Sequence, residues 1–160
     1  MVDYKHGRYL SNSLLKLAKR HDPAMSTEAL ALRDTNMKNA YLRTFTVLMY
    51  EFELGEVEKN MGAFAGMSLK FKALEMIRPI LQNHDGIELE DSFYIFEDPV
   101  DAFRGALAMK AKITAYNNSC KVHFDKIHLT GYGMHSGEML FIEGSDIHWG
   151  DPVNTSSKLG

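Results

Sequence analysis

The sequence predicts an α+β domain with a ferredoxin-like βαββαβ core, an antiparallel sheet covered on one face by helices. Three observations predict it. The run 45–53 is rich in β-branched and aromatic residues, two segments with helical periodicity alternate with short strand patterns, and 160 residues of ordinary composition, 45% hydrophobic, suffice for one core. This architecture serves many functions, so it selects none by itself.

Residues 1–44 are predicted to form a helical lead-in or linker to a domain spanning residues 45–160. Ser11–His21 and Thr27–Arg43 each space apolar residues at helical period, and Pro23 separates them. The apolar stripe of this lead-in requires a partner, which is either the following domain or a second copy of the chain. Residues 1–44 hold eight Lys and Arg against four Asp and Glu.

The first half of the domain begins with a strand at Phe45–Glu53, whose composition is typical of a central strand buried on both faces. A helix follows and ends near Asp85 and Gly86. Ile87–Asp91 and Ser92–Phe96 are predicted to be two short strands joined by a tight turn. The helix is predicted to bury one face made of Met67, Phe71, Leu74, Ile77 and Leu81.

The second half begins with a helix that Asp98 caps and Pro99 starts. A strand is predicted from Lys126 to Gly133, then a tight hairpin at Gly133–Glu138, and a returning strand at Met139–Ile142. A loop then enters a last helix, with Pro152 in its first turn. The helix that Asp98 caps is predicted to bury Val100, Phe103, Leu107 and Ile113, with Ala102 and Ala106 permitting close packing.

The bulk properties exclude several classes of protein. No run of eighteen apolar residues is present, and the first ten residues lack the apolar core of a signal peptide. A single cysteine, Cys120, fits a reducing compartment, so a cytoplasmic location is expected. Residues 45–160 hold ten Lys and Arg against seventeen Asp and Glu, which argues against a nucleic-acid partner.

Candidate chemistry lies near the end of the chain. Asn154 and Lys158 are one helical turn apart, so that an amide and a cation could hold a sugar hydroxyl and a phosphate. The segments around them resemble the class III nucleotidyl cyclase family. Gly133–Glu138 is similar to its G-I-H-T-G-E hairpin, Gly150–Lys158 to its G-D-x-V-N-x-A-x-R helix, and Phe96–Phe103 to its F-x-D-P-x-D-A-x segment.

The resemblance implies an activity and its requirements. Members of the family convert ATP or GTP to the 3′,5′-cyclic nucleotide and pyrophosphate, using two Mg²⁺ or Mn²⁺ ions held by two carboxylates. Their active site lies between two such domains, with the metal carboxylates on one protomer and the Asn/Arg pair on the other. The expected partners are therefore a nucleoside triphosphate and a second cyclase domain.

The resemblance also assigns roles by position. Glu51 takes the place of the first metal aspartate, and Asp91 that of the second, although aligning backwards from Phe96 favours Glu90 instead. Glu88 and Asp146 lie near the base-contacting positions. Asn154 matches the asparagine that orients the ribose, and Lys158 stands where most cyclases have the arginine that stabilises the transition state.

Departures from the family pattern leave two hypotheses. Glutamate at position 51 adds a methylene to the expected ligand, lysine at 158 lacks the planar fork of arginine, and Glu53 adds negative charge where phosphates are expected. The chain is either a divergent cyclase with weak or Mn²⁺-dependent activity, or a degenerate cyclase-homology domain that binds nucleotide or a partner domain. The choice between ATP and GTP stays open.

Overall fold

The structure is a computed structural model that describes residues 23–142 and 148–159. The chain divides into two compact units. One comprises Met1–Arg43 with Leu140–Trp149, and the other Thr44–Met139 with Gly150–Gly160. The predicted helix Ser11–His21 lies outside the described residues. Among the described helices, none is both long enough and apolar enough to cross a bilayer.

The first unit contains helix α2, Thr27–Tyr41, close to the predicted span. Its N-terminus is capped by Ser26, whose hydroxyl accepts a hydrogen bond from the backbone N–H of Ala29 at 3.2 Å. No residue of α2 is buried. The helix continues directly into strand β1, Leu42–Phe52.

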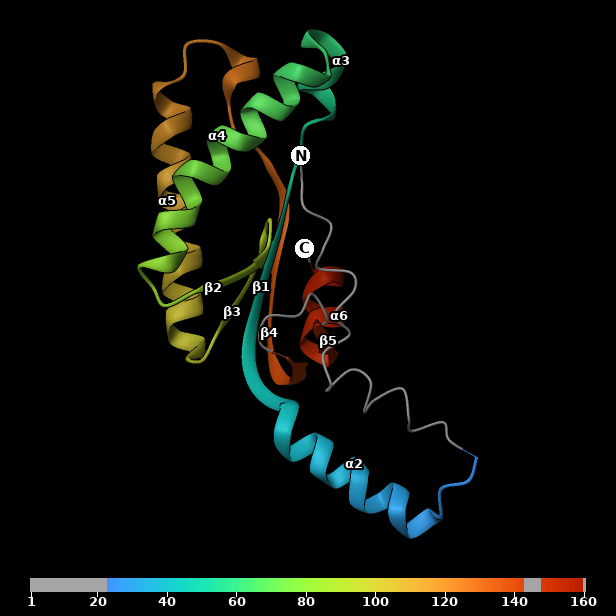
Figure 1. Ribbon diagram of the computed structural model, residues 1–160. Coiled ribbons are helices and arrows are strands. Elements are labelled where there is room, and N and C mark those ends of the chain that lie inside the picture. The colour runs from blue at the N-terminus through green and yellow to red at the C-terminus, as the bar shows by residue number, and fades with distance from the viewer. Residues whose placement is uncertain (1–22, 143–147, 160) are drawn as a thin grey trace. The chain divides into compact units, whose positions relative to one another are not determined.

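The predicted βαββαβ order is confirmed (Figure 1). The strands form one sheet of order β2-β3-β1-β4-β5, in which β3 pairs antiparallel with both β1 and β2. After β1 come α3 (Gly55–Met61), α4 (Ala63–Gln82), β2 (Ile87–Glu90), β3 (Phe93–Phe96), α5 (Pro99–Ser119), a 3₁₀ turn (His123–Asp125), β4 (Leu129–Phe141), β5 (His148–Gly150) and α6 (Asp151–Leu159).

The two long helices α4 and α5 cover one face of the sheet, and alternate residues of the strands bury against them (Figure 1). The helix α6, which follows the core, lies on the other face, where the buried hydroxyl of Ser156 donates to the carbonyl oxygen of Val47 at 3.3 Å. The core on the α4 and α5 side includes Leu48, Tyr50, Tyr94, Phe96, Ala73, Ile77, Leu81, Ala106 and Met109.

The predicted buried stripes of the two helices are partly wrong. On α5, Val100, Phe103 and Leu107 are 48%, 53% and 49% exposed. On α4, Met67 and Phe71 are also exposed. The buried residues are instead Gly66, Leu69, Ala73, Leu74, Ile77 and Leu81 on α4, and Ala102, Gly105, Ala106, Met109 and Ile113 on α5. The buried faces thus combine glycine and alanine with large aliphatic side chains, and they differ from the predicted faces mainly toward the N-terminal half of each helix.

The predicted hairpin at Gly133–Glu138 is wrong, because β4 runs through that segment as one strand of thirteen residues. None of its glycines has a positive φ, the conformation that the hairpin prediction required. The middle of β4 is held to β1 by a hydrogen bond between the hydroxyls of Thr46 and Ser136, 2.7 Å apart. Met139–Phe141, predicted to be part of a returning strand, is therefore the end of β4, and the short strand β5 falls where a loop was predicted.

Candidate nucleotide and metal site

The two predicted metal carboxylates belong to neighbouring segments of backbone. Met49 of β1 is paired with Phe93 of β3, and the backbone N–H of Tyr50 donates to the carbonyl oxygen of Ser92 at 3.1 Å. The end of β1, which carries Glu51, thus lies beside the β2–β3 turn, which carries Asp91. Strand pairing alone brings these positions together, although 40 residues of chain separate them.

The side chains of Glu51 and Asp91 point in different directions from their neighbouring backbone segments. Tyr50 and Phe52 pack toward α4 and α5, so strand alternation directs Glu51 to the other face, where its side chain is exposed. The carboxylate of Asp91 instead lies 3.6 Å from the ammonium of Lys70 on α4. Within residues 23–142 and 148–159, no three His, Cys, Asp or Glu side chains converge closely enough to hold a metal.

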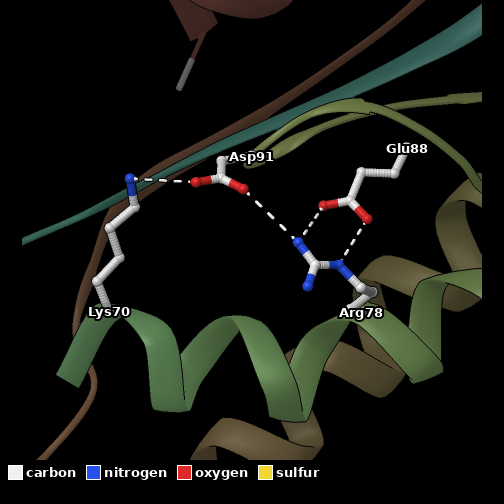
Figure 2. A network of polar contacts seen from close by, with 4 residues as sticks. All are labelled: Lys70, Arg78, Glu88 and Asp91. Atoms are coloured by element: carbon white, nitrogen blue, oxygen red, sulfur yellow. Dashed lines mark hydrogen bonds and ion pairs between the residues drawn. The ribbon is translucent and has the colours of Figure 1, made fainter. Parts of the chain in front are cut away.

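Figure 2 shows the polar network that ties the β2–β3 hairpin to α4. The Arg78 guanidinium donates to both carboxylate oxygens of Glu88, with Nε 2.6 Å and Nη2 2.7 Å from them. The same Nη2 lies 3.6 Å from Asp91. These bonds raise the pKa of Arg78, and paired N–H···O bonds of this kind are among the stronger polar contacts in proteins. Glu88, predicted to contact a base, therefore uses both oxygens within the chain.

Two buried tyrosines of the core, Tyr50 and Tyr94, lie next to this network. The rings of Tyr50 and Tyr94 stack with centroids 6.3 Å apart and planes inclined by 17°. Both hydroxyl oxygens are buried, and neither makes a hydrogen bond of good geometry among the described residues, although Ser92 lies near that of Tyr50 and the Arg78–Glu88 pair near that of Tyr94. Burial raises the pKa of both side chains, that of Tyr94 to about 12. Both tyrosine side chains under the β2–β3 hairpin are therefore uncharged at physiological pH.

The predicted ribose and phosphate groups lie on α6. Asn154 and Lys158 are both exposed, while Pro152 and Ser156 anchor the helix by burial on its other side. The sequence therefore folds this helix so that the amide and the cation share an accessible face. Asp146, predicted to contact the base, lies outside the described residues.

One contact joins the two motifs that carry the cyclase resemblance. His135 of the Gly133–Glu138 segment has its Nε2 3.2 Å from the Oδ2 of Asp151, which begins α6. Gly137 lies under α6 as well, since a Cβ atom there would be 3.0 Å from Pro152 Cγ. The sequence did not predict this contact, because it joins segments sixteen residues apart in the chain whose packing no local pattern specifies.

In the segment expected to receive phosphates, the side chain of Glu53 already accepts a backbone hydrogen bond. Glu53 accepts a hydrogen bond from the backbone N–H of Gly55 through Oε1 at 3.1 Å. An anion that used this N–H would have to displace the Glu53 carboxylate. The Glu53 carboxylate therefore adds negative charge here and also competes with a phosphate for the backbone N–H of Gly55.

The carboxylates present suit the metals that the resemblance implies. Mg²⁺ and Mn²⁺ prefer oxygen ligands, and Mg²⁺ in phosphate-transfer sites is bound by one or two carboxylates together with substrate phosphates. Glu51 is exposed, and the side chain of Asp91 is 50% exposed, so each carboxylate is open to an ion bound with a nucleotide, although the two side chains point in different directions here. The donor set fits, with Lys70 and Arg78 as nearby positive charges that sequence reasoning missed.

Comparison of the structure with solved proteins finds cyclases. An adenylate/guanylate cyclase/hydrolase from Silicibacter pomeroyi matches with a TM-score of 0.62 and 16% identity, covering 74% of this chain and 69% of that one. A guanylyl cyclase matches at 0.58 with 14% identity, covering 73% and 68%. A bacterial light-regulated adenylyl cyclase matches at 0.63 with 13% identity, covering 92% of this chain and about half of its own, 49%.

These likenesses establish that the chain has a cyclase-like fold. No protein-family model matches the sequence, and no curated protein matches it. The chain therefore resembles these cyclases in the arrangement of its elements rather than in sequence identity.

Proposed function

We propose that the chain is a divergent class III nucleotidyl cyclase domain that converts ATP or GTP to the 3′,5′-cyclic nucleotide and pyrophosphate. The observation that carries this proposal is the 3.1 Å hydrogen bond from Tyr50 to Ser92, which brings the strand end with Glu51 beside the turn with Asp91 in a cyclase-like fold. An exposed amide and cation on α6 support it further.

Each residue has a defined task in this proposal. Glu51 and Asp91 hold the divalent ions, which when bound activate the 3′-hydroxyl and neutralise the triphosphate. The Asn154 amide orients the ribose by hydrogen bonding, and the Lys158 ammonium attracts the phosphates. The partner in this reaction is a second copy of the domain or a paired one, which supplies the residues of α6 to the carboxylates of the first.

The activity is proposed to be weak and to favour Mn²⁺. Lys158 offers a point charge without the planar fork that grips two phosphate oxygens. Glu51 displaces its carboxylate by one methylene, and Mg²⁺ tolerates such displacement poorly because it requires near-octahedral geometry. We also propose that residues 1–44 form the lead-in to the domain and that the protein acts in the cytoplasm, where nucleoside triphosphates are supplied.

The deciding experiment measures cyclic AMP and cyclic GMP formed from ATP and GTP, with Mn²⁺ and with Mg²⁺. Asn154→Ala is compared with Asn118→Ala, which removes an exposed asparagine of α5. We expect product with Mn²⁺, little with Mg²⁺, and loss in Asn154→Ala alone. Inactivity with both ions, by a protein that is folded and dimeric, would sink the enzyme proposal.

A second candidate function is favoured by the ion pairs of Figure 2. Asp91 already lies near Lys70 and Arg78, and Glu88 is held by Arg78. These contacts suit a catalytically degenerate domain that binds a nucleotide or a partner domain without turnover. Saturable binding of Mn²⁺-ATP or Mn²⁺-GTP by equilibrium dialysis, with no product formed over hours, would establish that alternative.

A further inference from the structure

The two cations near Asp91 are anchored to different degrees. Arg78 is fixed by two short bonds to Glu88, whose side chain is only 19% exposed. Lys70 forms an ion pair with Asp91 at 3.6 Å, and both side chains reach solvent, 32% and 50% exposed. Arg78 therefore has a fixed position independent of Asp91, whereas Lys70 depends on Asp91 for its place (Figure 2).

We propose that Lys70 is a resident counter-ion of Asp91 which a divalent cation must displace, and that Arg78 is a positioning residue that fixes the β2–β3 turn through Glu88. The inference rests on the proposed function, because it takes Asp91 as a metal carboxylate. It assigns to α4 a part in setting metal affinity that the motifs of the cyclase resemblance do not include.

Electrostatics gives Lys70 this role. A positive charge about 4 Å from a carboxylate reduces the attraction that the carboxylate offers to an incoming ion, and it does so twice as strongly for a divalent ion as for a monovalent one. An exposed ion pair between a lysine and a carboxylate is weak, because water screens the two charges and the long lysine side chain loses conformational freedom on forming it. The lysine can therefore leave when a metal arrives, at a cost that lowers metal affinity.

Arg78 is expected to strengthen metal binding, the opposite of the effect of Lys70. Its removal leaves the largely buried Glu88 carboxylate without its bidentate donor, which is costly for a charged group. Glu88 is three residues from Asp91, so the turn that carries Asp91 loses its tie to α4. Loss of Arg78 should therefore loosen the metal carboxylate and weaken metal binding, although it also removes a positive charge.

The test is Mn²⁺ binding without nucleotide, measured by titration calorimetry or by the electron paramagnetic resonance signal of free Mn²⁺. Lys70→Met is compared with Lys72→Met, which removes the same charge from the same helix at a side chain that lies over the Tyr116 ring instead. We expect Lys70→Met to bind Mn²⁺ roughly 3- to 10-fold more tightly than Lys72→Met. The gain should vanish when Asp91→Asn is added to both variants.

Arg78→Met is measured beside Glu88→Gln, after circular dichroism has shown that both variants are folded. Both should bind Mn²⁺ several-fold more weakly than the wild type. If Arg78→Met binds more tightly, as Lys70→Met does, Arg78 is a second counter-ion and the positioning role is wrong. If either variant fails to fold, Arg78→Lys, which keeps one charge without the fork, replaces it.

The outcomes separate this inference from the proposed function. Product formation with equal Mn²⁺ affinity in Lys70→Met and Lys72→Met overturns the counter-ion role and leaves the cyclase proposal standing. Tighter binding in Lys70→Met without product from any variant supports the counter-ion role and defeats the cyclase proposal. Absence of Mn²⁺ binding by every variant overturns the inference.

Discussion

Gly86 and Gly105 show how differently two glycines of this chain tolerate a side chain. A Cβ atom at Gly86 would lie 2.8 Å from both the Leu81 carbonyl oxygen and Phe96 Cε1. At Gly105 the nearest atom is the end of the Leu81 side chain, 3.2 Å away. Backbone and a packed ring cannot move aside, whereas a leucine methyl group has some freedom to do so.

Gly86→Ala should therefore lower the free energy of unfolding by about 1–3 kcal/mol, the range for overfilling a packed site. Gly105→Ala is the matched comparison. It should be near neutral, because alanine gains about 1 kcal/mol of helix propensity that offsets a mild contact. Urea unfolding at neutral pH measures both, and equal losses in the two variants would contradict this account.

Tyr94 and Tyr50 make the stability of the domain sensitive to alkali. Burial raises the pKa of Tyr94 to about 12, and shifts that of Tyr50 in the same direction. Their contribution is complete below pH 10. From about pH 10 to about 12 the unfolded chain loses phenolic protons that the folded one retains, so stability falls. Urea unfolding at pH 9 to 11.5 should show this decline.

Tyr94→Phe should reduce the alkaline decline, with exposed Tyr132→Phe as control. At neutral pH the Tyr94→Phe protein should be equally stable or about 1 kcal/mol more stable, because it removes a buried hydroxyl that makes no hydrogen bond of good geometry among the described residues. An unchanged alkaline decline in Tyr94→Phe would show that another group causes it.

At the scale of elements, local chemistry correctly predicted where α5 begins. Asp98 caps α5, its Oδ1 accepting from the backbone N–H of Val100 at 2.8 Å, as the Asp-Pro pair indicated. Which residues of a helix form its buried face was less predictable. Spacing shows that a helix has an apolar face, but Ala102 and Phe103 lie about 100° apart around the helix, and the surface that the helix packs against decides which of them is covered.

Asp98→Ala should destabilise the domain by about 1 kcal/mol through loss of this cap. Glu97→Ala removes the same charge from an exposed neighbour that has no part in capping, and it should change stability by less than about 0.5 kcal/mol. Thermal and urea unfolding of the two variants measure the difference. Equal effects would mean that the charge near α5 matters rather than the hydrogen bond.

At the scale of the whole molecule, the cyclase proposal predicts a site shared between two copies. Asp91→Asn and Asn154→Ala should each be inactive alone. Mixed in equal amounts, they should recover about a quarter of wild-type activity, since half of the dimers are mixed and each of these has one intact site. Assay of the mixture after equilibration measures this. No recovery would place both residues in one protomer's site.

At the scale of the whole molecule, the fold is more similar to cyclases than the sequence is. Sequence identity to the similar cyclases is only 12–16%, and no family model matches, yet the TM-scores reach 0.63. Hydrophobic periodicity and a few motif residues preserve a fold long after most side chains have changed. The resemblance of the sequence to cyclases rests on a few motif residues, and the fold agrees with it.

The sequence by itself determined the order of the elements from β1 to α5 apart from the short helix α3, the cap at Asp98, and the placement of Asn154 and Lys158 on one exposed helical face. These follow from local propensity and period, which act within a few residues of chain. Tertiary structure alone decided that β4 continues through Gly133–Glu138 and that Arg78 binds Glu88. These features depend on contacts between distant segments, whose geometry a local pattern does not contain.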